Sequence, residues 1–359
     1  MVELNNEVIL SALRSVMDPE RGKDLVTLNM IRDIKIQGGS VSFTIVLTTP
    51  ASPLQNQIEA NAKNAVLSIP GVKLVAVKMS ADVPADEKLK TATPSPIKQS
   101  IAVASGKGGV GKSTVAVNLA IALAKAGAKV GLLDADIYGP NVPTMMGITQ
   151  LPVPIDGKLE PAVAYGVKVM SIGFLVPPGQ ALIWRGPMLH SAIKQFIFDV
   201  NWGELDYLVI DLPPGTGDAQ LSLAQNLPLS GGIIVTLPQQ VSVEDASRSL
   251  QMFQTLNVPI LGVIENMSYL VLPDGSRMSV FGEGGGLQLA LAAKVPFLGG
   301  IPMDPAVRAG GDEGEPFIIR HPESDASIAL LNIAEMIAAK LSGDATNSKT
   351  QGISVKVVE

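Results

Sequence analysis

The stretch Gly106-Lys107-Gly108-Gly109-Val110-Gly111-Lys112-Ser113-Thr114 decides the fold of this chain. It fits the pattern G-x-x-x-x-G-K-[ST] of phosphate-binding loops, between an apolar run at 101–104 and a helix-like stretch at 115–126. Glycines let the backbone turn tightly around an anion, and the helix that follows adds the positive end of its dipole. We therefore expect a strand, a loop and a helix whose residues 106–114 bind the phosphates of a nucleotide.

Three residues complete the expected chemistry of this loop. Lys112 is expected to reach the β- and γ-phosphates, and the Ser113 hydroxyl is expected to ligate Mg²⁺. The apolar strand 207–210 ends at Asp211, which is where P-loop nucleotide hydrolases place a second carboxylate for Mg²⁺. The Pro- and Gly-rich segment 211–218 lies at the carboxyl end of the same strand, so we expect it to respond to the γ-phosphate.

Other charged side chains near the loop have alternative interpretations. Asp136, which follows the strand 129–133 and Asp134, would orient the attacking water or would simply cap a loop. Asp134 is expected nearer the metal. Lys107 either points to solvent or, in a face-to-face dimer, contacts the nucleotide of the partner and stabilises developing charge as an arginine finger does.

The base of the nucleotide is harder to place from the residues, and adenine is one candidate. The chain has no Asn-Lys-x-Asp sequence to bind guanine, and Asn266 follows the strand 260–264 with an amide that offers both donors and acceptors. An asparagine at the end of a strand can equally be a turn residue. The candidate catalytic residues are therefore Lys107, Lys112 and Asp136, with Asn266 as a candidate contact to the base.

Short apolar runs alternate with helical stretches from residue 100 onward. Runs that are apolar throughout suit strands buried on both faces of a mostly parallel sheet, with helices as the connections. We therefore predict an α/β fold, a P-loop NTPase domain with a mostly parallel sheet. Beyond 101–104, the predicted strands are 129–133, 167–172, 207–210, 232–236, 260–264 and 295–298.

The beginning of the chain follows a different pattern. Helical and strand-like segments occur in the order α-β-β-α-β, typical of a small α+β domain, at 8–17, 31–36, 41–47, 54–67 and 72–79. Ser52 and Pro53 are placed to begin the second helix, as its N-cap and its first residue. We predict four parts, which are this domain at 1–79, a linker at 80–99, the nucleotide-binding domain at 100–341 and a flexible tail at 342–359.

Composition excludes several classes of protein. The net charge of −6 and the lack of a dense basic stripe argue against nucleic-acid binding. The late apolar stretch 328–341 contains Asn332, Glu335 and Lys340, so it suits a packed helix better than a membrane span. The chain has no cysteine, which excludes disulfides and thiolate metal sites. Together with the lack of a secretory pattern at the start, this leads us to expect a cytoplasmic protein.

These motifs resemble those of the Mrp/ApbC family of P-loop ATPases, in the deviant Walker A group with the ParA- and MinD-like proteins. The signature lysine of that group matches Lys107. The resemblance covers nearly the whole chain. It is carried by the loop 107–114, by 134–141 and 211–218, and by the blocks 265–269, 281–286 and 301–305. The first domain, through Asp18-Pro19-Glu20 and 48–53, resembles the small iron–sulfur assembly domain that is often fused to Mrp proteins.

The resemblance implies a homodimer that binds ATP with Mg²⁺, hydrolyses it slowly, and delivers [4Fe–4S] clusters to apoprotein clients or works with iron–sulfur assembly proteins. It also implies that Lys107 contacts the phosphates of the partner. Many family members carry a Cys-x-x-Cys after the 265–269 block and a cysteine in the first domain. This chain has 270–275 and Ser52 in those places, so it supplies no iron–sulfur ligand of its own.

Two alternatives to the carrier function follow from the missing cysteines. The first is a nucleotide-switched regulatory or cargo-positioning ATPase of the ParA/MinD-like kind that binds no cluster. The second is a scaffold in which ATP only sets the affinity for a client, which the complete set of Lys112, Asp136 and Asp211 disfavours. The tail 342–359 is neither strongly basic nor amphipathic, so we expect neither DNA nor membrane binding.

Overall fold

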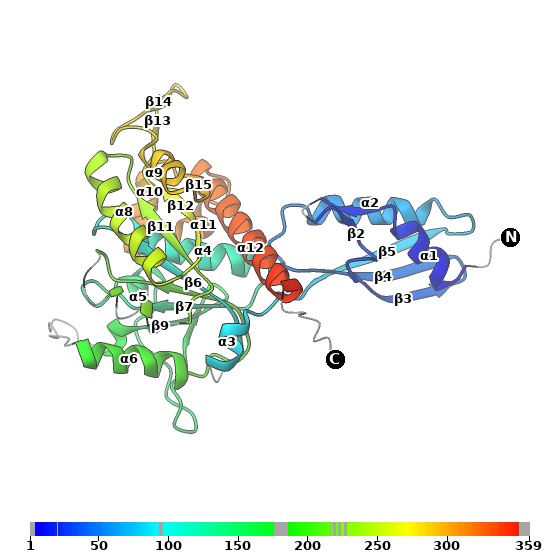
Figure 1. Cartoon of the computed structure of the whole chain (residues 1–359), viewed down its shortest axis with the longest axis horizontal. Coiled ribbons are helices and arrows are strands. Elements are labelled where there is room, and N and C mark those ends of the chain that lie inside the picture. Colours follow the sequence, from blue (N-terminus) through cyan, green and yellow to red (C-terminus); the bar gives the residue numbers. More distant parts are fainter. Residues whose placement is uncertain are drawn as a thin grey trace, which may run out of the picture. The chain divides into compact units, whose positions relative to one another are not determined.

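The computed structural model describes residues 4–19, 21–92, 96–175, 186–215, 217, 220–221, 224–225 and 228–351. The chain divides into two compact units, Met1–Val83 and Pro84–Glu359. Figure 1 shows both units, each with a sheet covered by helices. Each unit buries its own cluster of apolar side chains, so each is described by itself.

The smaller unit has the predicted α-β-β-α-β order, with one short hairpin added. Its sheet has the order β3-β4-β5, in which β3 and β4 are antiparallel and β4 and β5 are parallel. The inward face of β4 carries Phe43 and Ile45, which are buried beneath the two helices on one side of the sheet (Figure 1). The elements are α1 (Asn6–Leu13), β1 (Met17–Asp18), β2 (Lys23–Asp24), β3 (Ile31–Gln37), β4 (Ser40–Leu47), α2 (Gln55–Leu67) and β5 (Leu74–Ala81).

The expected N-cap of α2 is wrong by two residues. The helix begins at Gln55 after Leu54, and no side chain caps it. The Ser52 hydroxyl instead accepts a hydrogen bond from the Leu54 N–H at 3.3 Å. The bond closes a local turn that includes Pro53, so Ser52 orders the approach to the helix rather than its first turn.

The larger unit is an α/β domain with an eight-stranded sheet of order β15-β12-β11-β6-β10-β7-β9-β8. All neighbouring strands are parallel except β8, which pairs antiparallel with β9 at one edge. Every strand predicted in this domain is present, whereas β8 was not predicted. The strands are β6 (Ile97–Ser105), β7 (Val130–Asp134), β8 (Ala162–Ala164), β9 (Val167–Ser171), β10 (Leu205–Asp211), β11 (Gly231–Thr236), β12 (Ile260–Glu265) and β15 (Phe297–Gly300).

Helices cover both faces of this sheet, as the uniformly apolar strands require. Ala102 and Ala104 of β6 lie in an apolar cluster with Ile193, Phe253 and Leu289, which come from three helices. Alternate residues of β6 face the other side, where the loop helix lies. The helices are α3 (Glu87–Ala92), α4 (Lys112–Lys125), α5 (Val142–Met145), α6 (Gly186–Phe198), α8 (Gln240–Thr255), α9 (Gly285–Ala293), α10 (Pro305–Glu313), α11 (Phe317–Arg320) and α12 (Asp325–Gln351), and a short hairpin is formed by β13 (Leu270–Val271) and β14 (Arg277–Met278).

The predicted linker differs from the structure. β5 continues to Ala81, and the segment from Pro84 onward belongs to the larger unit. Leu89 and Ile97, at 1% and 3% exposure, are buried in its apolar cluster. The Gln99 amide donates to the Pro84 carbonyl oxygen at 2.6 Å. Because only a few apolar residues attach this segment to the larger unit, its overall composition resembles that of a linker.

The predicted flexible tail also differs from the structure. Helix α12 continues past Leu341 to Gln351, and residues 352–359 lie outside the described part. Extending an existing helix fixes one residue for each hydrogen bond gained, whereas starting one is costly. Among the described helices, only Asp325–Asp344 is long and apolar enough to cross a membrane by length and composition, and 50% of that window is buried.

The packing of α8 against the phosphate loop generates a test of the fold. A Cβ on Gly106 would overlap the backbone of Asp245 and Ala246 in α8, whereas a Cβ on Gly108 would meet nothing within 4 Å. Gly106→Ala should therefore lower the free energy of unfolding by about 1–3 kcal/mol, as overpacking does. Urea denaturation without nucleotide measures this change. Gly108→Ala is the control and should stay close to wild type, and equal losses in both variants would contradict the close approach of α8.

Candidate functional site

The phosphate loop has the predicted strand–loop–helix setting. Strand β6 ends at Ser105, and α4 begins at Lys112. Between them Gly109 and Gly111 have φ of 80° and 84°, a conformation that favours glycine. The Ser105 hydroxyl donates to the Lys107 carbonyl oxygen at 2.9 Å and so fixes the start of the loop.

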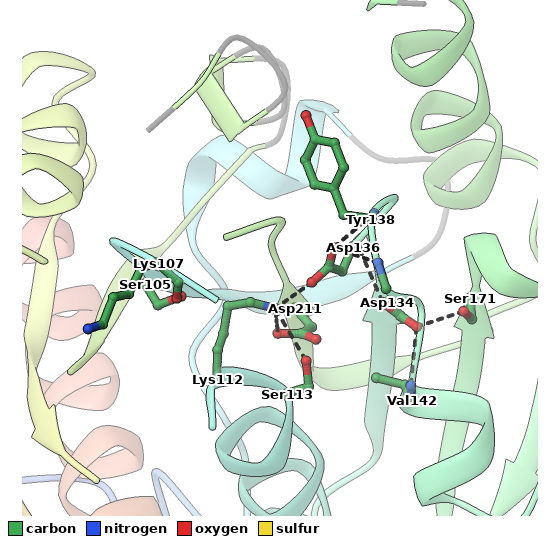
Figure 2. Close-up of polar contacts among 11 residues, drawn as sticks. Ser105, Lys107, Lys112, Ser113, Asp134, Asp136, Tyr138, Val142, Ser171 and Asp211 are labelled. Carbon is green, nitrogen blue, oxygen red and sulfur yellow. Dashed lines mark hydrogen bonds and ion pairs between the residues drawn. The ribbon is translucent and has the colours of Figure 1, made fainter. Parts of the chain in front are cut away.

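Lys112 lies at the centre of a buried ionic cluster (Figure 2). Its Nζ is 2.6 Å from Oδ1 of Asp211, 3.3 Å from Oδ2 of Asp136 and 3.3 Å from Oγ of Ser113. Burial alone would lower the pKa of Lys112, but the carboxylates of Asp211 and Asp136 outweigh it and raise the pKa. The structure thus brings four residues that the sequence singled out to one point.

Asp211 has the surroundings of a cation ligand. It is fully buried at the end of β10, and its Oδ2 has no hydrogen-bond partner in the described part of the chain. Burial raises the pKa of Asp211, which Lys112 only partly offsets. Mg²⁺ prefers oxygen ligands, and the oxygens of Asp211 and Ser113 meet at the Lys112 ammonium. These residues therefore fit Mg²⁺.

Asp134 has a different environment from the one expected. Its carboxyl oxygens accept hydrogen bonds from the N–H groups of Asp136 and Val142, at 3.1 Å and 3.3 Å, and from the Ser171 hydroxyl at 2.7 Å. These bonds occupy both oxygens, so the residue organises a loop rather than facing a metal. Burial, and then the charge of Asp211, raise the pKa of Asp134 to about 8. Ser171, which sequence reasoning missed, ends the strand beside β7, so only the strand order could have revealed it.

Asp136 is held so that one oxygen faces Lys112. Its Oδ1 accepts hydrogen bonds from the N–H groups of Tyr138 and Gly139, at 3.1 Å and 3.3 Å. Its Oδ2 is the oxygen paired with Lys112. Asp136 therefore caps its own loop, which is one of the two alternatives that the sequence left open, and it also pairs with Lys112.

The remaining predicted residues make no recorded ion pair with Lys112 in the described part of the chain. The side chain of Lys107 points away from Lys112 and Asp211 (Figure 2). The Asn266 amide is buried and donates to the Val110 carbonyl oxygen at 2.9 Å, so its donor supports the loop. In the segment 211–218 the Gly215 N–H donates to the Ser105 carbonyl oxygen at 2.9 Å, while Thr216 and Asp218 lie outside the described residues.

No iron ligand set is present in the described part of the chain. It contains no group of three or more His, Asp or Glu residues that could hold a metal ion. The whole sequence has no cysteine. His321 packs its ring against Phe317 at a centroid distance of 5.2 Å, and the side chain of His190 lies outside the described residues. Iron–sulfur clusters select soft thiolate ligands, so this donor set does not fit a cluster.

Two family models together span most of the chain. One, described as NUBPL iron-transfer P-loop NTPase, matches residues 96–338. The other, described as iron–sulfur cluster assembly protein, matches residues 6–94.

Relatives that match along nearly their whole length carry the name iron–sulfur cluster carrier protein. One from Synechocystis sp. is 51% identical over 347 residues, which is 94% of this chain and 98% of the relative. One from Deinococcus radiodurans is 50% identical over 340 residues, which is 94% of this chain and 96% of the relative.

Solved structures resemble the larger unit. A nucleotide-binding protein from Archaeoglobus fulgidus, solved in complex with ADP, is 41% identical with a TM-score of 0.56, covering 64% of this chain and 90% of that one. The cell division ATPase MinD of Pyrococcus furiosus is 25% identical with a TM-score of 0.52, covering 67% and 98%. The likeness agrees with the predicted P-loop NTPase fold.

The raised pKa of Asp134 predicts a pH dependence of stability. The folded state keeps the proton up to about pH 8, whereas the unfolded chain releases it near the ordinary value of 3.8. Because the folded state binds more protons in this window, stability falls as the pH rises through it. Asp134→Asn removes this proton, so its stability should fall less steeply, by roughly 1 kcal/mol per pH unit.

Urea denaturation between about pH 5 and about pH 7 measures this slope for both proteins. The variant Asp312→Asn is the control, because Asp312 is an exposed residue that pairs with Arg308 on the surface. It should follow the wild-type slope. Identical slopes for the wild type and Asp134→Asn would contradict the assigned protonation.

Proposed function

The chain belongs to the family of NUBPL iron-transfer P-loop NTPases, and on that premise we propose that it binds and hydrolyses ATP to carry iron–sulfur clusters between proteins. The observation that carries the proposal is the buried cluster of Lys112, Asp211, Asp136 and Ser113 at the phosphate loop. The likeness to an ADP-bound protein supports an adenine nucleotide. The names of the relatives, together with the match of 6–94 to an iron–sulfur cluster assembly model, support the cargo.

The hydrolytic step uses side chains already near one another. Lys112 would exchange its carboxylate partners for the β- and γ-phosphates, whose negative charge suits a buried ammonium. That exchange would free Oδ2 of Asp136 to orient a water molecule for in-line attack on the γ-phosphate and to accept its proton. Ser113 and Asp211 would hold Mg²⁺, which neutralises phosphate charge when bound.

Lys107 completes the site from a second copy of the chain in this proposal. Its side chain points away from its own cluster, which leaves it free of the carboxylates there and supports a role outside its own site. A cation that reaches the partner's phosphates stabilises charge only in the assembled dimer. Hydrolysis would therefore depend on dimerisation, whereas nucleotide binding would not.

The cluster is cargo whose thiolates come from elsewhere. Since this chain has no cysteine, the ligands must belong to client apoproteins, to assembly partners or to a small thiol such as glutathione. Thiolates persist in a reducing compartment, so we place this function in the cytoplasm, with proteins rather than nucleic acid or membranes as partners.

A second candidate function is a nucleotide-switched positioning ATPase that binds no cluster. It is favoured by the likeness to the Pyrococcus furiosus MinD structure and by the absence of cysteine. The two candidates share the ATP site and differ only in cargo, so a measurement of bound and transferred iron distinguishes them.

Subunit mixing tests the ATP site. Lys112→Ala should lose both ATP binding and hydrolysis, because it removes the buried phosphate contact. Lys107→Ala should keep ATP binding, but its rate of hydrolysis should fall by about tenfold or more. Mixing the two inactive variants should restore part of the activity, because one site then has both lysines. Turnover is measured by phosphate release. Full activity of Lys107→Ala, or no recovery on mixing, would refute the contact in trans.

Anaerobic reconstitution tests the cargo. The purified chain is incubated with iron and sulfide, with and without glutathione, and bound iron is measured before and after an apoprotein client is added. Without added thiol we expect background iron, and with glutathione we expect transfer of a cluster to the client. Background iron and an empty client in every condition would exclude the carrier function and favour the positioning ATPase. A stable cluster without any added thiol would contradict the ligand assignment.

A further inference from the structure

The loop 135–141, which carries Asp136, is held at both ends by one carboxylate. Asp134 accepts a hydrogen bond from the Asp136 N–H through Oδ1 at 3.1 Å and from the Val142 N–H through Oδ2 at 3.3 Å. Asp134 is the last residue of β7 and is fully buried. Its side chain thus links the end of β7 to the start of α5 and holds the two ends of the loop together.

A second strand fixes the orientation of this carboxylate. Ser171 ends β9 and is the direct neighbour of Asp134 in the parallel pairing of β7 and β9. Its hydroxyl accepts a hydrogen bond from the Gly173 N–H at 2.9 Å and donates to Oδ2 of Asp134 at 2.7 Å. A serine hydroxyl has only one proton to donate. The Gly173 contact occupies the acceptor side, so that proton is directed at Asp134 (Figure 2).

The two hydrogen bonds that Asp134 accepts from the loop help to determine which oxygen of Asp136 faces Lys112. Oδ1 of Asp136 is used by the N–H groups of Tyr138 and Gly139 inside the loop, and Oδ2 is left 3.3 Å from the Lys112 ammonium. If the ends of the loop move, the Asp136 carboxylate moves with them. In the described part of the chain the ion pairs of Lys112 are with Asp136 and Asp211, and Asp134 acts on Lys112 only through its charge at longer range.

We propose that Ser171, acting through the carboxyl group of Asp134, is a positioning residue that holds Asp136 beside the phosphate loop, where hydrolysis needs it. This inference rests on the proposed ATPase function. Small displacements of a catalytic group cost rate much more than they cost binding, because binding is shared by the whole phosphate loop. Loss of the Ser171 hydroxyl should therefore lower kcat with little effect on nucleotide affinity.

The chain contains a matched control for a buried strand hydroxyl. Ser100 of β6 is 1% exposed, donates to the Pro228 carbonyl oxygen and accepts a hydrogen bond from the Ser230 N–H at 3.1 Å. Its hydroxyl, like that of Ser171, donates one hydrogen bond and accepts one, but it lies six residues before Gly106, where the phosphate loop begins. Ser100→Ala and Ser171→Ala remove the same group from comparable surroundings.

The experiment compares both variants of the full chain with wild type. Steady-state phosphate release gives kcat, and equilibrium binding of a fluorescent ATP analogue gives Kd. We expect Ser171→Ala to lose about tenfold or more in kcat with Kd within about twofold, since misplacement by about an ångström has such effects. Ser100→Ala should keep the wild-type kcat. A wild-type kcat for Ser171→Ala, or an equal loss in both variants, would overturn the proposal.

Hydrogen exchange tests the hydrogen bonds between Asp134 and the loop independently of activity. The amides of Asp136 and Val142 bond to Asp134, so Ser171→Ala should speed their exchange relative to wild type and to Ser100→Ala. Unchanged exchange would overturn the positioning role. If the wild type fails to hydrolyse ATP, the proposed function fails, and the exchange measurement alone then decides whether Ser171 holds the loop.

Discussion

The buried contact between the Lys112 ammonium and the Asp211 carboxylate is the interaction on which the site depends. Neither ion is stable in a dry interior without the other, because desolvation of a lone charge costs several kcal/mol. The contact forms only because β6 and β10 are neighbours, so that the phosphate loop and Asp211 leave the sheet at the same edge. Strand β7 lies on the other side of β10 and adds Asp134 and Asp136. The strand order thus assembles the site. In the proposed mechanism, nucleotide binding replaces the carboxylates around the Lys112 ammonium by phosphates.

Much of this arrangement could be predicted from the sequence, because the relevant signals are local. A glycine-rich loop between an apolar strand and a helix, and an apolar run ending in Asp211, depend on residues close together in the chain. The strands of the large unit were found for the same reason. Predictions failed where a few contacts between distant parts of the chain decide whether a segment packs. Leu89 and Ile97, for example, are buried in the larger unit, although the composition around them resembles a linker.

Partners that belong to different strands were beyond sequence reasoning. Ser171 contacts Asp134 only because β9 pairs with β7, and nothing near Ser171 in the chain indicates that register. Asn266 stays a candidate contact to the base of the nucleotide, but sequence reasoning missed the hydrogen bond that its amide donates to Val110 in the loop itself. Both residues support others that the sequence did identify. The motif residues were therefore predictable, whereas the residues that hold them in place were not.

The division of the chain at Val83 and Pro84 has a consequence for how such a protein can arise. Each unit buries a separate apolar cluster, and a separate family model matches each one. A break in the coding sequence at this point would leave both clusters whole. Each half therefore keeps its own apolar cluster whether the two are encoded by one gene or by two.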